Sequence, residues 1–209
     1  MIAAAEAVRR SVSLGTALVG LVLTAPLALA VALAVRLTMG SGVLFRQQRL
    51  GLGGHPFMLL KFRTMKHAKN GREGPEFDGE RMTRLGTWLR ASSIDELPSL
   101  WNLLRGDITL VGPRPLPVHY WHRFRGHEYR RFQVKPGITG LAQVSGRNAV
   151  DWDERLSLDV RYVRDRSLFG DLRIVLRTIP TVLGRGGVSH GDSVTMHALP
   201  ENRPEPPPG

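Results

Sequence analysis

The chain has 209 residues, no cysteine and a formal net charge of +11, from 29 Lys and Arg against 18 Asp and Glu. The absence of cysteine excludes disulfides and thiolate metal sites, and the length predicts one domain of ordinary size, with or without a membrane element. The basic excess fits nucleic acid, anionic lipid head groups or phosphorylated substrates and does not choose among them.

The first predicted element is an apolar helix. Ser11 to Val35 holds no charged residue, and roughly 25 positions are enough for a helix inserted in a bilayer. Three interpretations compete: a signal peptide, a transmembrane span kinked at Pro26, and a re-entrant helix broken at Pro26 that returns to the same face. Arginines flank both ends (Arg9 and Arg10, then Arg36), a symmetry that suits both ends lying in the cytoplasm.

Two short strands and a helix are predicted next. Val43–Arg49 and Pro56–Phe62 read as a hairpin across a glycine-rich turn, and the second strand carries Lys61 to its end with Arg63 just beyond. Both cations could be ordinary solvated strand charges. Lys66 to Asp78 reads as a mobile loop. In Arg84 to Arg90 the spacing predicts a helix that buries Leu85, Trp88 and Leu89 and points Arg90 toward the acidic pair described next.

An adjacent acidic pair, Asp95 and Glu96, precedes a helix that buries Leu97, Leu100, Trp101 and Leu104. Pro98 is tolerated only in a first turn, so the helix begins near the two carboxylates. One interpretation is purely structural: Ser93 and Glu96 fit a capping box, and acids in a first turn complement the helix dipole.

The segment after this helix favours a functional interpretation of the acidic pair. Gly106 is placed to end the helix, Asp107 to Val111 alternates like a short strand, and Gly112–Pro115 is a rigid turn that presents Arg114. A guanidinium held near two carboxylates suits a site for phosphate and metal.

The rest of the chain gives weaker signals. Val118 to Phe132 mixes aromatics with cations. Three interpretations fit: core aromatics with solvated cations around them, an amphipathic helix at the membrane interface, and nucleic-acid binding. No nucleic-acid-binding motif accompanies the segment, so we expect no nucleic-acid partner. Lys135 to Asn148 is a glycine-containing loop without P-loop order. Asp151 to Arg164 and Leu168 to Leu183 read as helices, the second able to rest on anionic lipid through Arg173, Arg177 and Arg185. His190 to Gly209 reads as disordered.

Several long motifs occur in order and together resemble one family. They are K-F-R-T-M from Lys61, R-L-G-x-x-L-R from Arg84, S-x-D-E-L-P-x-L-x-N from Ser93, V-G-P-R-P from Val111, and K-P-G-I-T-G-L-A-Q-V-S-G-R-N from Lys135, followed by Asp159-x-x-Tyr162. With these motifs the chain resembles the bacterial sugar transferases, monotopic phosphoglycosyl transferases that move a phosphosugar from a nucleotide diphosphate sugar to a polyprenyl phosphate. Motifs of this length in sequence are far more specific than one short match.

The resemblance implies a fold and a topology. The implied fold class is α+β, with a re-entrant membrane helix over residues 1–40, a mixed α/β catalytic domain over 41–187 that contains the hairpin and amphipathic interface helices, and a disordered tail over 188–209. It places the protein at the inner cytoplasmic membrane with the catalytic domain facing the cytoplasm. Membrane lipid and downstream glycosyltransferases are the further implied partners. The sequence does not indicate an oligomeric state.

The resemblance also implies the chemistry. Asp95 would be the nucleophile that forms a covalent phosphosugar intermediate, since a carboxylate is ionised at neutral pH without a general base. Glu96, with Asp95, would bind Mg²⁺, which uses one or two carboxylates plus substrate oxygens. Five cations would hold phosphate groups: Lys61, Arg63, Arg90, Arg114 and Arg147. The donor would be a UDP-sugar and the acceptor undecaprenyl phosphate; a membrane-anchored magnesium-dependent phosphatase or nucleotide-sugar hydrolase is the alternative.

Overall fold

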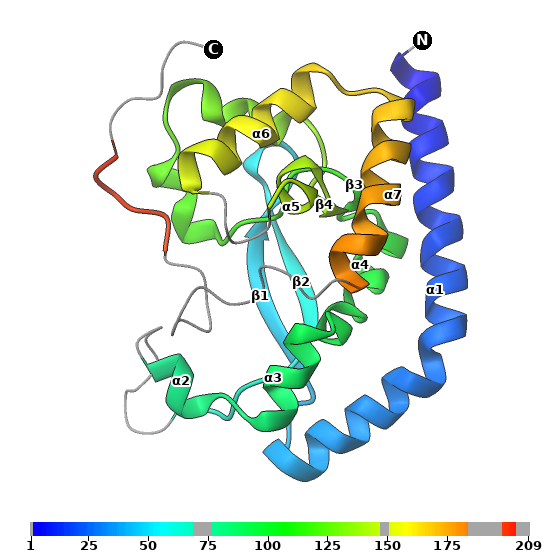
Figure 1. Cartoon of the computed structure of the whole chain (residues 1–209), viewed down its shortest axis with the longest axis vertical. Coiled ribbons are helices and arrows are strands. Elements are labelled where there is room, and N and C mark those ends of the chain that lie inside the picture. The colour runs from blue at the N-terminus through cyan, green and yellow to red at the C-terminus, as the bar shows by residue number, and fades with distance from the viewer. Residues whose placement is uncertain (1, 69–76, 147–150, 184–197, 204–209) are drawn as a thin grey trace.

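The computed structural model describes residues 2–68, 77–146, 151–183 and 198–203. It is a mixed α/β fold in which one long N-terminal helix lies beside a domain with small sheets (Figure 1). The helices are α1 (Ile2–Met39), α2 (Asp78–Arg81), α3 (Arg84–Ala91), α4 (Ser99–Arg105), α5 (Leu141–Val144), α6 (Trp152–Arg164) and α7 (Leu168–Leu183). The strands are β1 (Leu44–Leu50), β2 (Pro56–Phe62), β3 (Thr109–Val111) and β4 (Gly137–Thr139), and short 3₁₀ segments are η1 (Leu52–Gly54), η3 (Ile94–Glu96), η4 (Val118–Arg123) and η5 (Gly126–Gln133).

The predicted interruption of α1 at Pro26 is a bend within one helix. Helix α1 continues through Pro26 and changes direction partway along its length (Figure 1). Proline has no N–H, so the carbonyl of Val22 loses its helical donor and the helix can bend there. The hydroxyl of Thr24 donates to the carbonyl of Gly20 at 2.6 Å, so it does not replace that donor. By length and composition α1 is able to cross a membrane.

Both halves of α1 are attached to the same domain. In the first half, Arg10 donates to the carbonyls of Leu103 and Leu104, each at 2.8 Å, and the buried hydroxyl of Ser13 contacts that of Thr109 at 3.2 Å. In the second half, an apolar cluster packs against the hairpin and α3; its buried members are Val31, Val35, Met39, Phe62 and Leu89. Between and beside these contacts, α1 exposes large apolar side chains: Val8, Val12, Leu18, Val19, Val22, Leu23, Leu27, Leu29, Leu33 and Leu37.

The predicted hairpin is confirmed. Strands β1 and β2 pair antiparallel, with Leu44 opposite Phe62 and Leu50 opposite Pro56. The buried side chain of Asn102 joins β2 to α4: it accepts from the Leu60 amide at 3.0 Å and donates to the Met58 carbonyl at 2.7 Å. The end of β2 is therefore fixed relative to the start of α4.

Strands β3 and β4 pair in parallel, Thr109 with Gly137 and Val111 with Thr139. Gly137 is required there because a Cβ atom would come within 2.1 Å of the Gly112 nitrogen. Gly106 ends α4 in the left-handed conformation, at φ 84°, as its position predicts. This pairing brings the predicted glycine-containing loop against the turn that carries Arg114.

Two tryptophans predicted to be buried are exposed. Trp88 is 51% exposed and Trp101 is 48% exposed. The buried side of α3 instead contains Leu89 and Gly86. At Gly86 the helix lies so close to the Thr64 carbonyl that an added Cβ atom would overlap it. The buried side of α4 runs through Ser99, Asn102 and Leu103, because Asn102 must reach β2. Backbone contacts therefore set the orientation of both helices.

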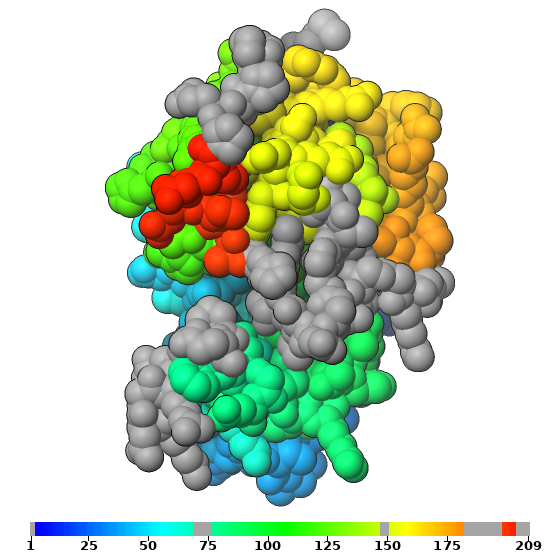
Figure 2. Space-filling model, turned by 60° about the vertical axis from the view of Figure 1, so that its left-hand side comes forward, coloured from blue at the N-terminus to red at the C-terminus, as the bar shows by residue number. Residues whose placement is uncertain are grey.

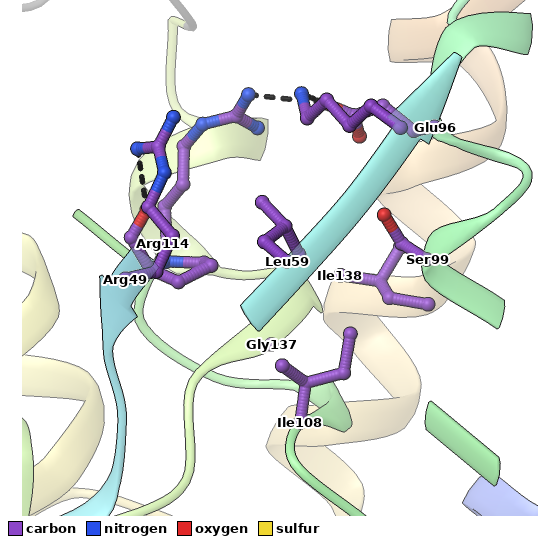
Figure 3. A pocket seen from close by; sticks show the side chains of 10 residues that line it. Arg49, Leu59, Glu96, Ser99, Ile108, Arg114, Gly137 and Ile138 are labelled. Atoms are coloured by element: carbon purple, nitrogen blue, oxygen red, sulfur yellow. Dashed lines mark hydrogen bonds and ion pairs between the residues drawn. The ribbon is translucent and has the colours of Figure 1, made fainter. Parts of the chain in front are cut away.

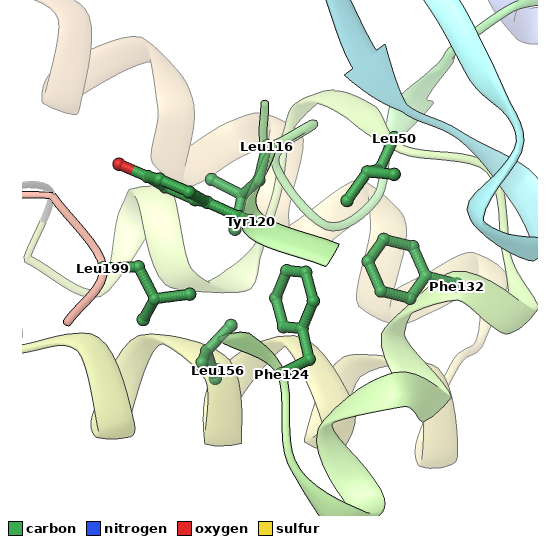
Figure 4. Close-up of a cluster of buried hydrophobic side chains, with 7 residues drawn as sticks. All are labelled: Leu50, Leu116, Tyr120, Phe124, Phe132, Leu156 and Leu199. Atoms are coloured by element: carbon green, nitrogen blue, oxygen red, sulfur yellow. The ribbon is translucent and has the colours of Figure 1, made fainter. Parts of the chain in front are cut away.

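The aromatic and basic segment of η4 and η5 supplies core side chains, as the structural interpretation of that segment predicts. Its aromatics join a cluster from distant elements (Figure 4); the buried members are Leu50, Leu116, Tyr120, Phe124, Phe132, Leu156 and Leu199. An amphipathic interface helix in this segment would need these side chains free to face lipid. The segment therefore forms part of the domain core.

Part of the C-terminal tail is ordered, contrary to prediction. Residues 198–203 lie against η4, η5 and α6 (red in Figure 2), with Leu199 fully buried. Arg203 is also buried and forms two hydrogen bonds with the Glu128 carboxylate, at 3.0 and 2.9 Å. Arg123 also donates to the Leu199 carbonyl at 2.6 Å and pairs with Glu201. A buried leucine, ion pairs and hydrogen bonds therefore hold a segment whose composition alone predicts disorder.

The last two predicted helices are confirmed as α6 and α7. Asp151 caps α6 by accepting from the Glu154 amide at 2.8 Å. Helix α7 leaves an apolar strip exposed, made of Leu168, Phe169, Leu172, Leu176 and Ile179, beside the exposed cations Arg173 and Arg177. Such a strip marks an interaction surface. Arg185 lies outside the described residues.

Candidate active site

The acidic pair lies in the 3₁₀ turn η3, between α3 and α4. Ser93 precedes it in the left-handed conformation, with φ 59°, and makes no side-chain cap hydrogen bond. The predicted capping box is therefore wrong: at this backbone angle Ser93 forms the sharp exit from α3 instead. Helix α4 begins at Ser99 directly after Pro98, so the two carboxylates lie in a separate short turn just before α4 rather than at its first residues, where we predicted the helix to begin.

Glu96 is held by two cations that come from distant parts of the chain. The Nζ atom of Lys61, in β2, lies 2.6 Å from Glu96 Oε1, and Nη2 of Arg114 lies 3.0 Å from the same oxygen (Figure 3). Burial alone would raise the pKa of Glu96. The charges of Lys61 and Arg114, together with their hydrogen bonds, overcome that effect and lower this pKa well below its ordinary value.

Asp95 has a different environment from its neighbour. It is 7% exposed, and the closest cation among the described residues is Lys61, 4.0 Å from Oδ2. Burial raises the pKa of Asp95; the charge of Lys61 opposes this rise, Glu96 adds to it, and Arg90 opposes it further. The environments push the two carboxyl pKa values apart, a pattern common at functional sites.

Four of the predicted phosphate-binding cations are described, and three of them surround the acidic pair. Lys61 and Arg114 contact Glu96, while Arg90 influences Asp95 from the end of α3 and donates from Nε to the Thr64 hydroxyl at 3.0 Å. Arg63 is turned away: its Nη2 donates to the carbonyls of Met39 and Gly40 at the end of α1. Arg147 lies outside the described residues.

The turn that carries Arg114 is held at successive carbonyl groups. The Pro113 carbonyl accepts from the Gly137 amide at 3.0 Å. The carbonyl of Arg114 itself accepts from Arg131 Nη2 at 2.7 Å, and the Pro115 carbonyl accepts from Arg49 Nη1 at 3.0 Å. Because these donors belong to separate elements, the turn is fixed from several sides and Arg114 is pre-positioned.

A pocket of about 370 Å³, counting its open mouth, lies beside Glu96 and Arg114. Its lining residues are Arg49, Leu59, Lys61, Glu96, Ser99, Ile108, Arg114, Pro115, Gly137 and Ile138 (Figure 3). The motif interpretation did not select Arg49. Strand alternation is the signal that could have found it, because it places Arg49 and the exposed Arg46 on opposite faces of β1.

The donor set fits magnesium better than a closed metal site. Among the described residues no group of three or more His, Cys, Asp or Glu side chains is placed to hold a metal ion. Asp95 and Glu96 offer two carboxylates, which matches the one or two that Mg²⁺ takes alongside water and substrate phosphate oxygens. Both ion pairs of Glu96 use Oε1, so Oε2 is the atom that a cation could approach without displacing Lys61 or Arg114.

Two carboxylates with separated pKa values, fixed cations and an adjoining pocket define an enzyme site suited to phosphate groups. A family model described as "Bacterial sugar transferase" matches residues 4–185. The chain belongs to this family.

Curated relatives agree with this assignment. The chain is 47% identical over 161 residues to the Uncharacterized sugar transferase EpsL of Bacillus subtilis, covering 77% of this chain and 80% of that protein. It is 47% identical over 171 residues to the UDP-glucose:undecaprenyl-phosphate glucose-1-phosphate transferase of Caulobacter vibrioides, covering 77% of this chain and 64% of that protein. It is 37% identical over 196 residues to the Exopolysaccharide production protein ExoY of Rhizobium meliloti, covering 85% and 87%.

Proposed function

We propose that the chain transfers a sugar 1-phosphate from a UDP-sugar to undecaprenyl phosphate, the first membrane step of exopolysaccharide assembly. The relatives named for this reaction in Caulobacter vibrioides and Xanthomonas campestris support the substrate pair. The observation that carries the proposal is the asymmetric acidic pair. Glu96 is neutralised by two cations, while the buried Asp95 is left with Lys61 at 4.0 Å.

In the first step we assign the nucleophile to Asp95. A carboxylate oxygen of Asp95 forms a bond to the β-phosphorus of the donor, and the bond from that phosphorus to the bridging oxygen breaks. UMP leaves with the bonding electron pair, and the phosphosugar stays on Asp95 as an acyl phosphate. Lys61 and Arg114 lie where they can stabilise the charge that develops on phosphate oxygens.

In the second step an oxygen of undecaprenyl phosphate bonds to the same phosphorus, and the bond to Asp95 breaks. The carboxylate is regenerated, and the sugar is now linked to the lipid through a diphosphate. No external base is needed, because the acceptor phosphate and Asp95 are both anionic at neutral pH. Bound Mg²⁺, held by Asp95 and Glu96, would neutralise negative charge on the substrate phosphates.

The expected consequence is that Asp95→Asn abolishes transfer, with a loss on the order of a thousandfold or more, since an amide cannot form the acyl phosphate. The measurement incubates the purified chain with Mg²⁺ and a panel of UDP-sugars labelled with ³²P at the β position, without acceptor. The native chain should retain label on Asp95 and release UMP.

The matched control is Asp165→Asn, which removes a carboxylate 52% exposed on the surface and should leave labelling unchanged. Addition of undecaprenyl phosphate should move the label into lipid. Label released as free sugar phosphate, at a rate that the lipid does not change, would identify a hydrolase. If the Asp95→Asn variant still becomes labelled, Asp95 is not the nucleophile.

We also infer that α1 is re-entrant and that the catalytic domain faces the cytoplasm. Ser13 and Val35 are both buried against the domain, and they lie about 33 Å apart along a straight helix, close to the thickness of the hydrocarbon core. A helix that crossed the bilayer would put its two ends on opposite sides, yet both are attached to one domain. The bend at Pro26 allows α1 to enter and return.

This topology predicts that both ends of α1 are accessible from the cytoplasm. Because the chain has no cysteine, single introduced cysteines can be labelled without background. Ala7→Cys and Thr38→Cys should react with an impermeant maleimide in inverted membrane vesicles and not in right-side-out vesicles. Val22→Cys, at an exposed apolar position, should be protected by lipid in both. Reaction of the first two cysteines from opposite sides would establish a span instead.

A further inference from the structure

The pocket beside the acidic pair carries more positive than negative charge. Three of its lining side chains are cationic, Arg49, Lys61 and Arg114, and one lining residue, Glu96, is a carboxylate. Lys61 and Arg114 both pair with Glu96. Among the described residues no carboxylate lies within ion-pair distance of Arg49. Arg49 therefore feels the charge of Glu96 only from beyond ion-pair distance and, in the described part of the chain, has no ion-pair partner of its own.

The hydrogen bonds of Arg49 are made to neutral acceptors. Its Nη1 donates to the Pro115 carbonyl at 3.0 Å and its Nη2 to Oε1 of Gln47 at 2.5 Å. Its Nε is buried without a partner in the described part of the chain. Burial, and then the charge of Arg114, lower the pKa of Arg49 to about 10, so the guanidinium is still charged at neutral pH.

This arrangement is unfavourable in the free protein. A charge that leaves water loses hydration energy, which is regained only through an opposite charge or full hydrogen bonding. Figure 3 shows the side chains of Arg49 and Arg114 beside each other, with the guanidinium of Arg114 turned toward Glu96. A neutral amide is also a hydrogen-bond donor and would avoid the repulsion from Arg114. The hydrogen bond therefore does not account for a charged residue at this position.

We propose that Arg49 is a phosphate-binding residue, which supplies positive charge to the pocket beyond ion-pair distance of Asp95 and Glu96. The inference rests on the proposed function and deepens it: Lys61 and Arg114 act at the acidic pair, while Arg49 holds a phosphate oxygen farther from it. The phosphate belongs either to the nucleotide diphosphate of the donor or to the lipid acceptor. Both present the same chemistry, an anionic oxygen that suits a guanidinium.

The test measures binding rather than turnover. The full chain in detergent micelles is titrated calorimetrically with UDP and Mg²⁺ in one arm, and with farnesyl phosphate in the other. Arg49→Gln should weaken binding of at least one probe by roughly tenfold to a hundredfold, the effect of losing a hydrogen bond to a charged group. Arg49→Lys, which keeps the charge, should recover part of the loss.

The matched control is Arg46→Gln, which removes the same charge from an exposed position on the opposite face of β1 and should leave both affinities unchanged. Weakening in the UDP arm alone would assign Arg49 to the donor, and weakening in the farnesyl phosphate arm alone would assign it to the acceptor. Unchanged affinity in both arms, with native binding intact, would overturn the inference. A native chain that binds neither probe would count against the proposed function itself.

Unfolding without ligand separates binding from a structural role. If Arg49 is kept for an anion, the ligand-free Arg49→Gln variant should melt no lower than the native chain, because the repulsion from Arg114 is relieved. The rise in melting temperature that UDP or farnesyl phosphate produces should then be smaller than in the native chain. A variant that melts lower without ligand, and is stabilised by both probes as much as the native chain, would make Arg49 a structural residue.

Discussion

Two groups of charged side chains in this domain differ in how their charges are matched. Behind the active site, Arg131 and Asp159 form an ion pair whose side chains are 1% and 2% exposed, with hydrogen bonds of 3.1 and 2.7 Å to a single carboxylate oxygen. At the active site, Glu96 is shared by two cations and Asp95 has none within 3.5 Å among the described residues. The first group is balanced and the second is not.

We propose that this difference separates charges that stabilise the fold from charges that bind a ligand. A buried pair in which each charge has an opposite partner is compensated in the free protein and gains nothing from an added ion. A group in which cations outnumber the carboxylates they pair with is fully compensated only when a phosphate or another anion binds. The two groups are connected, because Arg131 also donates to the carbonyl of Arg114 at 2.7 Å. The balanced pair thus fixes the backbone of a residue in the unbalanced group.

The largest expected effect comes from breaking the balanced pair. Asp159→Asn leaves the charge of Arg131 buried without a partner, and we expect it to lower the free energy of unfolding by about 3–5 kcal/mol. Urea denaturation in detergent micelles, followed by tryptophan fluorescence, measures the loss. Asp159→Asn combined with Arg131→Met removes both charges and should recover part of the stability. A loss below about 1 kcal/mol for the single variant would show that the pair does not stabilise the fold.

Much of the local geometry around the candidate site could be predicted because its signals are local. The position of Pro98 set the start of α4 to within a few residues, Gly106 marked its end, and the Gly-Pro-Arg-Pro turn placed Arg114 outward. The hairpin that delivers Lys61 followed from alternation around a glycine-rich turn. Each of these features depends on the conformational preference of a few neighbouring residues, which a single sequence retains.

The rest depended on contacts between distant segments. Nothing near Leu199 predicts that it fills the core, because its partners come from β1, the η4–η5 region and α6. The orientation of Trp101 followed from the need of Asn102 to bind β2. Arg49 looked like an ordinary strand cation until the fold placed it beside Arg114. A sequence can assign residue types to a site, but charge balance becomes visible only when the tertiary neighbours are known.

A smaller effect is expected on the pH dependence of catalysis. The charge of Lys61 lowers the pKa of Asp95, against the larger effect of burial that raises it. Lys61→Met should therefore raise this pKa, so that Asp95 becomes protonated at a higher pH. In the proposed mechanism only the carboxylate form of Asp95 attacks phosphorus, so the acid limb of kcat/KM should move toward neutral pH. The control Lys66→Met, at an exposed position in the next segment, should leave the acid limb unchanged. If Lys61→Met also leaves the acid limb unchanged, the charge of Lys61 does not control the ionisation of Asp95.

The smallest expected effect is a shift of the same acid limb when Arg90 is replaced. Its charge also lowers the pKa of Asp95, but less than that of Lys61, so Arg90→Met should move the acid limb in the same direction by a smaller amount. Arg90 also donates to the Thr64 hydroxyl, and Thr64→Val removes that hydrogen bond while keeping the charge. If Arg90 acts on Asp95 through its charge, Thr64→Val leaves the limb where it is in the native chain. A shift in Thr64→Val equal to that in Arg90→Met would mean that the hydrogen bond, and the position it gives Arg90, controls the ionisation of Asp95.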